Sequence, residues 1–186
     1  MLRYGLAFLF LCLPSIAAAQ AAVLERLGEP RTHAIMRHAL APGTGDPENF
    51  SLGDCTTQRN LSENGRAQAR RAGDLVRRAG VRIDHVWSSA WCRCLDTATE
   101  MELGPVERKT LLNSFVSARW KAAQRTRETR EALAFLPPDE TAFLVTHNVN
   151  AEALTGTRPL SGEIQVVHVS ERGEVTLLGS VEVPAF

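Results

Sequence analysis

The sequence predicts an α/β protein, a three-layer αβα sandwich with a mostly parallel central sheet. Two observations lead to this fold class. Short apolar stretches with strand character alternate along the chain with amphipathic stretches of helical period, as in sheets that helices cover on both faces. The chain has 186 residues and no internal repeat, which fits one domain with one sizeable core.

The first half of the domain is expected to hold two strands and two helices. Residues 32–37 cluster apolar side chains as a buried strand, and "IDHVWSS", residues 83–89, predicts a second strand. A helix is expected over residues 62–79, with Ser62 as N-cap and Gly80 as stop, and another over residues 92–102. The apolar stripe of the first helix consists of Ala67, Ala69, Ala72, Leu75 and Val76.

The second half is expected to begin with a charged helix over residues 119–136, which ends at Pro137-Pro138. A third strand over residues 141–147 precedes a short helix over residues 148–154. "EIQVVHV" and "EVTLLGSVEV" then predict a closing hairpin around "SERGE". Basic residues in the charged helix alternate with glutamates, so we interpret that run as a solvated helix face.

The first nineteen residues resemble a secretory signal peptide, so the expected domains are a cleaved leader, 1–19, and a folded domain, 20–186. The leader combines a basic start at Arg3, a short apolar run, Pro14 and small residues at Ala17 and Ala19. Cleavage is expected after Ala19, with Ala21 as the second choice and an uncleaved anchor as the alternative. The mature protein is therefore expected to be periplasmic or secreted, with no stable membrane insertion.

Charge and cysteine content narrow the kinds of partner. The formal net charge is +0, which gives no general reason to expect nucleic-acid binding, so any anion recognition must be local. Cys55, Cys92 and Cys94 follow the leader, and an oxidising compartment favours one disulfide between Cys55 and either of the other two. A zinc site would need a fourth ligand, and the C-x-C pattern is weak support for one.

Polar residues follow three of the predicted strands. The first strand ends in Arg37-His38, the second in Ser88-Ser89 with Arg93 just beyond, and the third in Thr146-His147. Parallel strands bring their carboxyl ends to one edge, where ligands bind in such sheets. Each residue alone would be an ordinary surface or structural polar group, but together they predict a phosphoryl site, because the planar fork of arginine matches phosphate oxygens. His33, His85 and His168 are interpreted as structural.

The motifs that carry these residues resemble those of the histidine phosphatase superfamily, with the phosphoglycerate mutase-like fold. "MRHA" follows a strand, "RNLSENGRAQA" and "SSAWCRCLDTA" come next, and a late strand ends in "VTH". The family patterns are R-H-G, R-x-L-[ST]-x-x-G-x-x-Q-A, S-S-x-x-x-R-x-x-x-T-A and T-H. They occur in order over nearly the whole mature chain, which resembles small exported bacterial members in particular.

The resemblance implies a phosphatase of the histidine acid type, a phosphoric monoester hydrolase. His38 would be the nucleophile that forms a phosphohistidine, and Arg37, Arg93 and His147 would hold the phosphoryl oxygens. Arg59 is a further expected substrate contact. No metal or other cofactor is expected, because the arginines and His147 would supply the positive charge. The expected substrate is a phosphorylated small molecule or a cell-envelope sugar phosphate, and the sequence leaves the oligomeric state open.

Two positions depart from the family pattern. Ala39 replaces the glycine after the catalytic histidine, and the carboxylate that protonates the leaving group is missing from its usual places, where this chain has "LLNSFVSARW" and Asn148. Asp46 and Glu48 are the candidate proton donors, because they lie in the long loop 40–58 that is expected to border the pocket. Asp54 and Glu163 are weaker candidates.

Three functions remain compatible with the sequence. The first is an exported phosphomonoesterase that works through phosphohistidine. The second is a phosphohistidine or phosphoramidate phosphatase with the same site, which the missing acid favours. The third is a catalytically weak phosphate-binding member of the same fold.

Overall fold

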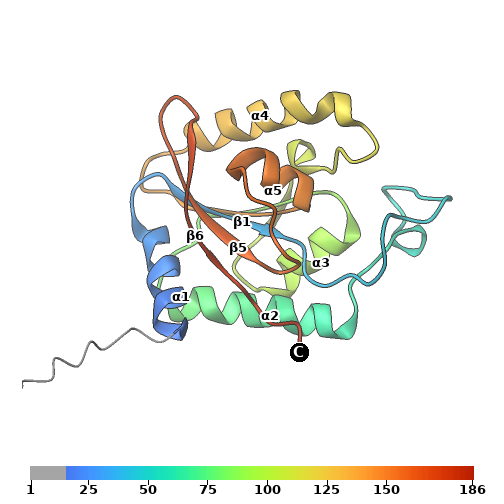
Figure 1. Cartoon of the computed structure of the whole chain (residues 1–186), viewed down its shortest axis with the longest axis horizontal. Helices are drawn as coiled ribbons and strands as arrows, with labels where there is room; N and C mark the ends of the chain where they lie inside the picture. Colours follow the sequence, from blue (N-terminus) through green and yellow to red (C-terminus); the bar gives the residue numbers. More distant parts are fainter. Residues whose placement is uncertain (1–15) are drawn as a thin grey trace, which may run out of the picture.

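The computed structural model describes residues 16–186, and the fold class is confirmed. A six-stranded sheet with the order β3-β2-β4-β1-β5-β6 lies between two helical layers (Figure 1). The strands are β1 Thr32–Arg37, β2 His85–Ser88, β3 Val106–Arg108, β4 Ala142–Thr146, β5 Ile164–Val169 and β6 Val175–Val181. The helices are α1 Ile16–Glu25, α2 Glu63–Arg78, α3 Cys92–Glu100, α4 Ala122–Ala134 and α5 Asn148–Thr155.

The sheet is mostly parallel, as predicted. β1, β2, β3 and β4 run in the same direction, whereas β5 is antiparallel to β1 and forms the predicted hairpin with β6. Helices α4 and α5 cover one face of the sheet, and α1, α2 and α3 lie on the other (Figure 1). The carboxyl ends of the parallel strands face the side from which loop 40–58 projects.

The two faces of the sheet bury separate apolar clusters. Along β1 the buried side chains alternate, so that Ala34 and Met36 join the cluster under α2 and α3, and Ile35 joins the one under α4 and α5. A central parallel strand is apolar on both faces for this reason. The α2 helix starts as predicted, with the Ser62 hydroxyl accepting a hydrogen bond from the Gly65 amide at 3.1 Å.

Some elements differ from the prediction. Strand β3 was not predicted, because its three residues are too few and too polar to show a strand pattern. The charged helix begins with a 3₁₀ turn over Arg119–Lys121 before α4 starts. Helix α1 was not predicted either, because its first residues fall within the stretch assigned to the leader.

The predicted leader lies mostly outside the described residues, since nothing before residue 16 is described. Both predicted cleavage positions, Ala19 and Ala21, fall within α1, and the first buried core residues that follow them are Leu24 and Leu27. Cleavage at either position would leave these two residues in the mature chain. No helix in the described range has the length and apolar character needed to span a membrane.

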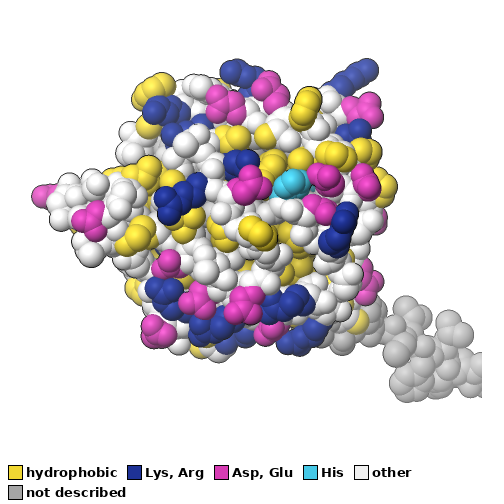
Figure 2. Space-filling view, turned by 180° about the vertical axis from the view of Figure 1, so that it is seen from behind, with side chains coloured by type: hydrophobic (Ala, Val, Ile, Leu, Met, Phe, Trp, Pro, Cys, Tyr) yellow, Lys and Arg dark blue, Asp and Glu magenta, His cyan; other side chains and the backbone are white. Residues whose placement is uncertain are grey.

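The surface over α2 carries charges of both signs. Along the lower edge of the face in Figure 2, Lys and Arg side chains alternate with Asp and Glu side chains. Ion pairs explain part of this pattern, with Arg66 bonded to Asp96 at 2.9 Å and to Glu100 at 3.2 Å. This edge therefore offers no surface of a single charge for a polyanion.

Candidate active site

Strand register brings the predicted site residues together. Arg37 at the end of β1 pairs with Thr146 of β4, and Ser88 of β2 pairs with Val145. The residues that follow these strands border a pocket of about 460 Å³. Of the predicted site residues, Arg37, His38, Asp46, Arg59, Arg93 and His147 line it, together with Gly43, Thr44, Gly45, Pro47, Phe50, Trp91, Ser114, Val116, Ser117, Asn148 and Arg158.

His38 is buried with one ring nitrogen engaged. Its Nδ1 lies 2.8 Å from the carbonyl oxygen of Ala39, which can only accept, so Nδ1 carries the proton and Nε2 has the lone pair. Burial lowers the pKa of His38 to about 3; the Ala39 hydrogen bond opposes this shift, and the nearby arginine charges reinforce it. At neutral pH the imidazole is therefore uncharged and able to attack an electrophile through Nε2.

His147 lies beside His38, with 5.7 Å between the ring centroids. Its Nε2 is 2.9 Å from the oxygen of the Ser89 hydroxyl. The same hydroxyl oxygen is 3.3 Å from Asn113 Oδ1. Asn113 Oδ1 can only accept, so the Ser89 hydroxyl donates to it, and the hydroxyl oxygen accepts from His147 Nε2. Burial lowers the pKa of His147 well below its ordinary value, with the charge of His38 as the next cause. Burial thus disfavours the charged form of His147, and Arg37, Arg59 and Arg93 are the charged side chains that act on it.

A free thiol also touches His147. Cys94 Sγ is 3.6 Å from His147 Nε2, and the cysteine is fully buried. Burial raises the pKa of the Cys94 thiol to about 12, so it is protonated and unreactive at neutral pH. Cys94 therefore packs against the site without supplying a nucleophile.

Arg37 and Arg93 each have one part of the guanidinium held by the protein. Arg93 bonds to Asp46, and Arg37 Nη1 donates to the Pro159 carbonyl at 3.5 Å. In both side chains Nε is buried and has no hydrogen-bond partner among the described residues. Buried donors without partners are unfavourable, and the oxygens of a phosphoryl group would satisfy them.

Two helices begin at this pocket. Trp91 is the N-cap residue of α3 and His147 is that of α5. The amino ends of helices carry partial positive charge and exposed amide hydrogens. They add to the arginine charges, so the pocket favours an anion.

Asp46 is unsuited to the role of proton donor that the sequence suggested. Burial of this carboxyl raises its pKa, but hydrogen bonds from Arg93 and Trp91 and the Arg93 charge outweigh that effect, and the net pKa is lowered. The carboxylate is therefore ionised at neutral pH. Its position in the pocket agrees with the sequence expectation, whereas its state suits an acceptor and not an acid.

The other carboxylate candidates lie outside the pocket. Glu48 is exposed and does not line it. Asp54 accepts hydrogen bonds from Thr56 at an exposed 3₁₀ turn, and Glu163 accepts one from the Leu160 amide at 2.8 Å. Among the described residues Asp46 is thus the one carboxylate that lines the pocket.

Loop 40–58 forms one wall of the pocket and is fixed to the start of α3. The disulfide joins Cys55 to Cys92, one of the two predicted pairings, and Cys94 is the free thiol. Arg59 stabilises the loop from within, because its guanidinium donates to the carbonyls of Gly45, at 2.8 Å, and Ala41. Arg59 therefore reaches the pocket as predicted, but part of its donor capacity serves the loop.

The aromatic residues at the mouth divide into two groups. Phe50 stacks on Trp91 with ring centroids 5.3 Å apart, and both line the pocket. Trp120 is 77% exposed, and Lys121 lies over its ring. Trp120 does not line the pocket.

Several motif residues position the chain around His38 rather than contact a ligand. Gln68 Oε1 accepts a hydrogen bond from the Leu40 amide at 2.9 Å, and Thr97 Oγ1 accepts one from the Ala39 amide at 3.0 Å. Gly65 packs against the Leu40 carbonyl so closely that an added Cβ would lie 2.1 Å from the oxygen. The motif spacing thus fixes the two residues after the histidine.

Sequence reasoning missed two site residues. Arg158 lines the pocket from the segment after α5 and is 3.5 Å from Glu152. It belongs to no motif, so no signal identified it. Asn113 was noted only as a position without a carboxylate, yet its Oδ1 accepts from the Ala90 amide at 2.8 Å beside Ser89.

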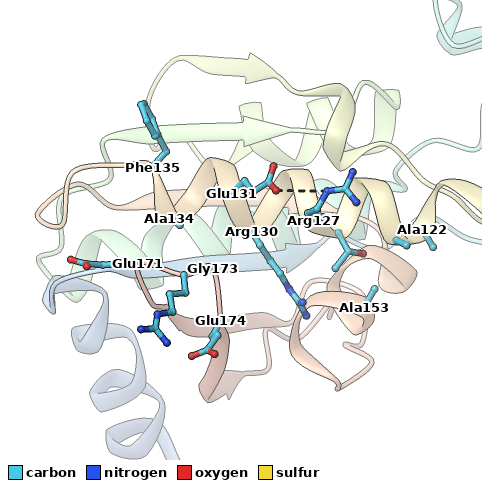
Figure 3. Close-up of a pocket in the computed structure, with 13 residues that line it drawn as sticks. Ala122, Arg127, Arg130, Glu131, Ala134, Phe135, Ala153, Glu171, Gly173 and Glu174 are labelled. Carbon is cyan, nitrogen blue, oxygen red and sulfur yellow. Dashed lines mark ion pairs between the residues drawn. The ribbon is translucent and has the colours of Figure 1, made fainter.

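A larger cavity of about 880 Å³ runs along α4 (Figure 3). Its charged residues are Arg127, Arg130, Arg172, Glu131, Glu171 and Glu174, and Arg127 faces Glu131 at 3.7 Å. The charges balance and, within the described part of the chain, no histidine or cysteine lines this cavity, so size alone does not make it the catalytic candidate. Within residues 16–186 no group of three or more His, Cys, Asp or Glu side chains is arranged to hold a metal ion.

Comparison with known proteins agrees with this geometry. The model of the histidine phosphatase superfamily (branch 1) matches residues 34–121. The protein histidine phosphatase SixA complexed with tungstate is 20% identical with a TM-score of 0.58, over 81% of this chain and 96% of SixA. No curated protein sequence matches the chain.

Two further solved structures have the same fold. Mycobacterial glucosyl-3-phosphoglycerate phosphatase Rv2419c is 18% identical with a TM-score of 0.57, over 79% of this chain and 95% of that one. YhfR from Bacillus stearothermophilus is 17% identical with a TM-score of 0.58, over 83% and 98% of the two chains. The matched segment contains His38, Arg59 and Arg93, so the resemblance to the histidine phosphatase superfamily is confirmed over residues 34–121, and the solved structures share the fold.

Proposed function

We propose that this protein hydrolyses phosphomonoesters through a phosphohistidine formed on Nε2 of His38. The observation that carries the proposal is the uncharged, buried His38 with Nδ1 bonded to Ala39, in a pocket lined by Arg37, Arg59, Arg93 and Arg158. An uncharged imidazole surrounded by arginine side chains is suited to attack a phosphoryl dianion.

The proposed reaction has two steps. The Nε2 lone pair forms a bond to phosphorus while the bond from phosphorus to the substrate oxygen breaks, and the leaving oxygen takes a proton from water. The positive charge that develops on the ring is stabilised through Nδ1–H by the Ala39 carbonyl. Water then attacks phosphorus, the N–P bond breaks, the proton that the attacking water loses neutralises the hydroxide left by the first step, and inorganic phosphate leaves neutral His38. The arginines hold the equatorial oxygens in both steps.

A second candidate is hydrolysis of P–N bonds, in a phosphoramidate or phosphohistidine. Among residues 16–186 the one carboxylate that lines the pocket, Asp46, is ionised and bonded to Arg93, so none of these residues places a carboxylic acid there to protonate a poor leaving group. General acid catalysis contributes about 10²–10⁴-fold. A leaving nitrogen that carries its own proton depends less on such an acid, which supports this alternative.

We also propose that the mature protein is exported to the periplasm or secreted. The leader pattern supports this location, and so does the Cys55–Cys92 disulfide, because such bonds persist in oxidising compartments. N-terminal sequencing of the mature protein tests the proposal. A start at Gln20 or Ala22 is expected, and an intact Met1 on protein in the cytoplasm would contradict it.

The catalytic proposal is tested with three substrates, p-nitrophenyl phosphate, a sugar phosphate and phosphoramidate. They are offered to the wild type, to His38→Ala and to the control His85→Ala, whose histidine pairs with Glu140 outside the pocket. Turnover of the two esters that is lost only in His38→Ala is expected. Turnover of phosphoramidate alone would favour the second candidate, and phosphate binding without turnover would identify a non-catalytic member of the fold.

A further inference from the structure

Asp46 places a carboxylate inside a pocket that is otherwise suited to anions. It accepts hydrogen bonds from Arg93 Nη1 at 2.6 Å and Nη2 at 3.3 Å, from Trp91 Nε1 at 3.0 Å and from the Arg59 amide at 3.2 Å. Its side chain is 18% exposed and that of Arg93 is 5% exposed. A carboxylate with this many donors is a built part of the site.

The pairing with Asp46 leaves one edge of Arg93 unused. A guanidinium is planar and has two bidentate edges, one made by Nη1 and Nη2 and the other by Nε and Nη2. Asp46 takes the first edge, and Nη1 also donates to the Arg59 carbonyl at 3.3 Å. Nε has no hydrogen-bond partner in the described part of the chain. Because the group is rigid, fixing the first edge also fixes the direction of the second.

Two consecutive residues at the start of α3, Trp91 and Cys92, hold loop 40–58 and Asp46 in place. Trp91 bonds to Asp46, and Cys92 carries the disulfide to Cys55. The Cys92 amide also donates to Oε1 of Gln58, the last residue of the loop, at 3.0 Å. The carboxylate is therefore attached to the helix that carries Arg93, and its position does not depend on a ligand.

We propose that Asp46 is a positioning residue. It holds Arg93 so that the Nε edge of the guanidinium meets the transferred phosphoryl group, and Asp46 stays paired with Arg93 during turnover. The inference rests on the proposed function, since it assigns a direction to an arginine that binds the phosphoryl oxygens. It replaces the role of proton donor with a role in orientation. Two other roles make different predictions: a general acid, and a resident anion that competes with phosphate.

The test compares Asp46→Asn with the wild type. The control Asp74→Asn removes a carboxylate that is paired with Arg77 on the exposed side of α2, outside the pocket. The substrates are p-nitrophenyl phosphate and phenyl phosphate, which differ in leaving-group basicity, and inorganic phosphate serves as inhibitor. Positioning predicts that Asp46→Asn lowers kcat/KM by about 10–100-fold, by the same factor for both esters. The Ki of inorganic phosphate should rise about 10-fold, and the control should match the wild type.

Each other outcome overturns the inference. A larger loss for phenyl phosphate than for the nitrophenyl ester identifies Asp46 as the general acid. A lower Ki for phosphate identifies a competing anion, and unchanged kinetics identify a bystander. If His38→Ala retains full activity, the proposed function itself fails. His38-dependent turnover that is insensitive to Asp46→Asn contradicts the positioning role alone.

A double-mutant cycle with Arg93→Lys separates orientation from a general loss of folding. Lysine has no second edge to direct, so the effect of Asp46→Asn on kcat/KM should shrink to less than about threefold in the Arg93→Lys background. An undiminished effect in that background would show that Asp46 does not act through Arg93. Thermal melting of all four proteins establishes that the compared species are folded.

Discussion

Nδ1 of His38 donates a hydrogen bond to the carbonyl oxygen of its own neighbour, Ala39, over 2.8 Å. The contact determines which ring nitrogen keeps the proton and holds the ring in one orientation, since the Ala39 amide is in turn bonded to Thr97. The nucleophile is therefore prepared by the backbone of its own turn, and no carboxylate is needed to orient it.

Acid should destabilise the protein through its buried histidines. The pKa is lowered by burial from 6.5 to about 3 for His38 and to about 4 for His33. The unfolded chain therefore binds more protons than the folded chain in this window, and stability present above pH 6.5 is lost as the pH falls. Between pH 7 and pH 5 the loss from His38 alone is expected to be about 2 kcal/mol.

Urea unfolding of the wild type and of His38→Gln at these two pH values measures that contribution. From pH 7 to pH 5 the fall in the free energy of unfolding should be about 2 kcal/mol smaller in the variant than in the wild type. An equal fall in both proteins would mean that His38 is not buried in the uncharged form.

Reduction of the disulfide should weaken both the fold and the site. The bond closes a loop with a sequence separation of 37 residues, so its loss is expected to lower the free energy of unfolding by about 3–4 kcal/mol. Activity should fall as well, because loop 40–58 carries Asp46 to Arg93. Urea unfolding and turnover with and without reductant test this, and the double variant Cys55→Ser/Cys92→Ser should not respond to reductant. Unchanged stability and turnover in protein whose disulfide is shown by thiol titration to be fully reduced would refute this prediction.

Gly65→Ala should disturb the turn after the nucleophile. The added Cβ would lie 2.1 Å from the Leu40 carbonyl oxygen, which forces α2 and the residues after His38 apart. A loss of about 2 kcal/mol or more in unfolding free energy, with lower kcat, is expected. Gly28→Ala is the matched control, because no atom lies within 4 Å of its added Cβ. Similar melting temperatures for the two variants would contradict this account of the motif.

Ala39→Gly should not improve catalysis. The family pattern has glycine here, but Ala39 is not among the described residues with positive φ, and it is fully buried. Restoring glycine therefore relieves no strain, and it lowers stability by about 1 kcal/mol through unfolded-state entropy and lost contacts. Steady-state kinetics and thermal melting of the variant test this. An increase in kcat would mean that the methyl group obstructs the reaction.

Much of the fold and part of the site could be predicted because local signals carry them. Apolar strands that end in Arg37-His38 and Thr146-His147 predict both the parallel sheet and the edge where these residues meet. Periodicity with a good N-cap predicts α2 almost to the residue. Strand β3 has no such signal, because its residues lie at a short, exposed edge.

The remainder depends on tertiary contacts that spacing does not encode. The choice of Cys92 over Cys94 as the disulfide partner depends on which side of α3 faces loop 40–58. Arg158 reaches the pocket only because the chain returns there after α5. Asp46 was correctly placed near the pocket, but its pairing with Arg93, and hence its ionised state, follows from the path of the folded loop.

The most direct test of the central claim is chemical trapping of the intermediate. The enzyme is mixed with p-nitrophenyl phosphate labelled with ³²P and quenched in alkali during turnover, because phosphohistidine survives alkali and is lost in acid. Peptide mapping by mass spectrometry should locate the phosphate on His38, with no labelled peptide in His38→Ala. Steady turnover without label on His38, or label on another residue, would contradict the account.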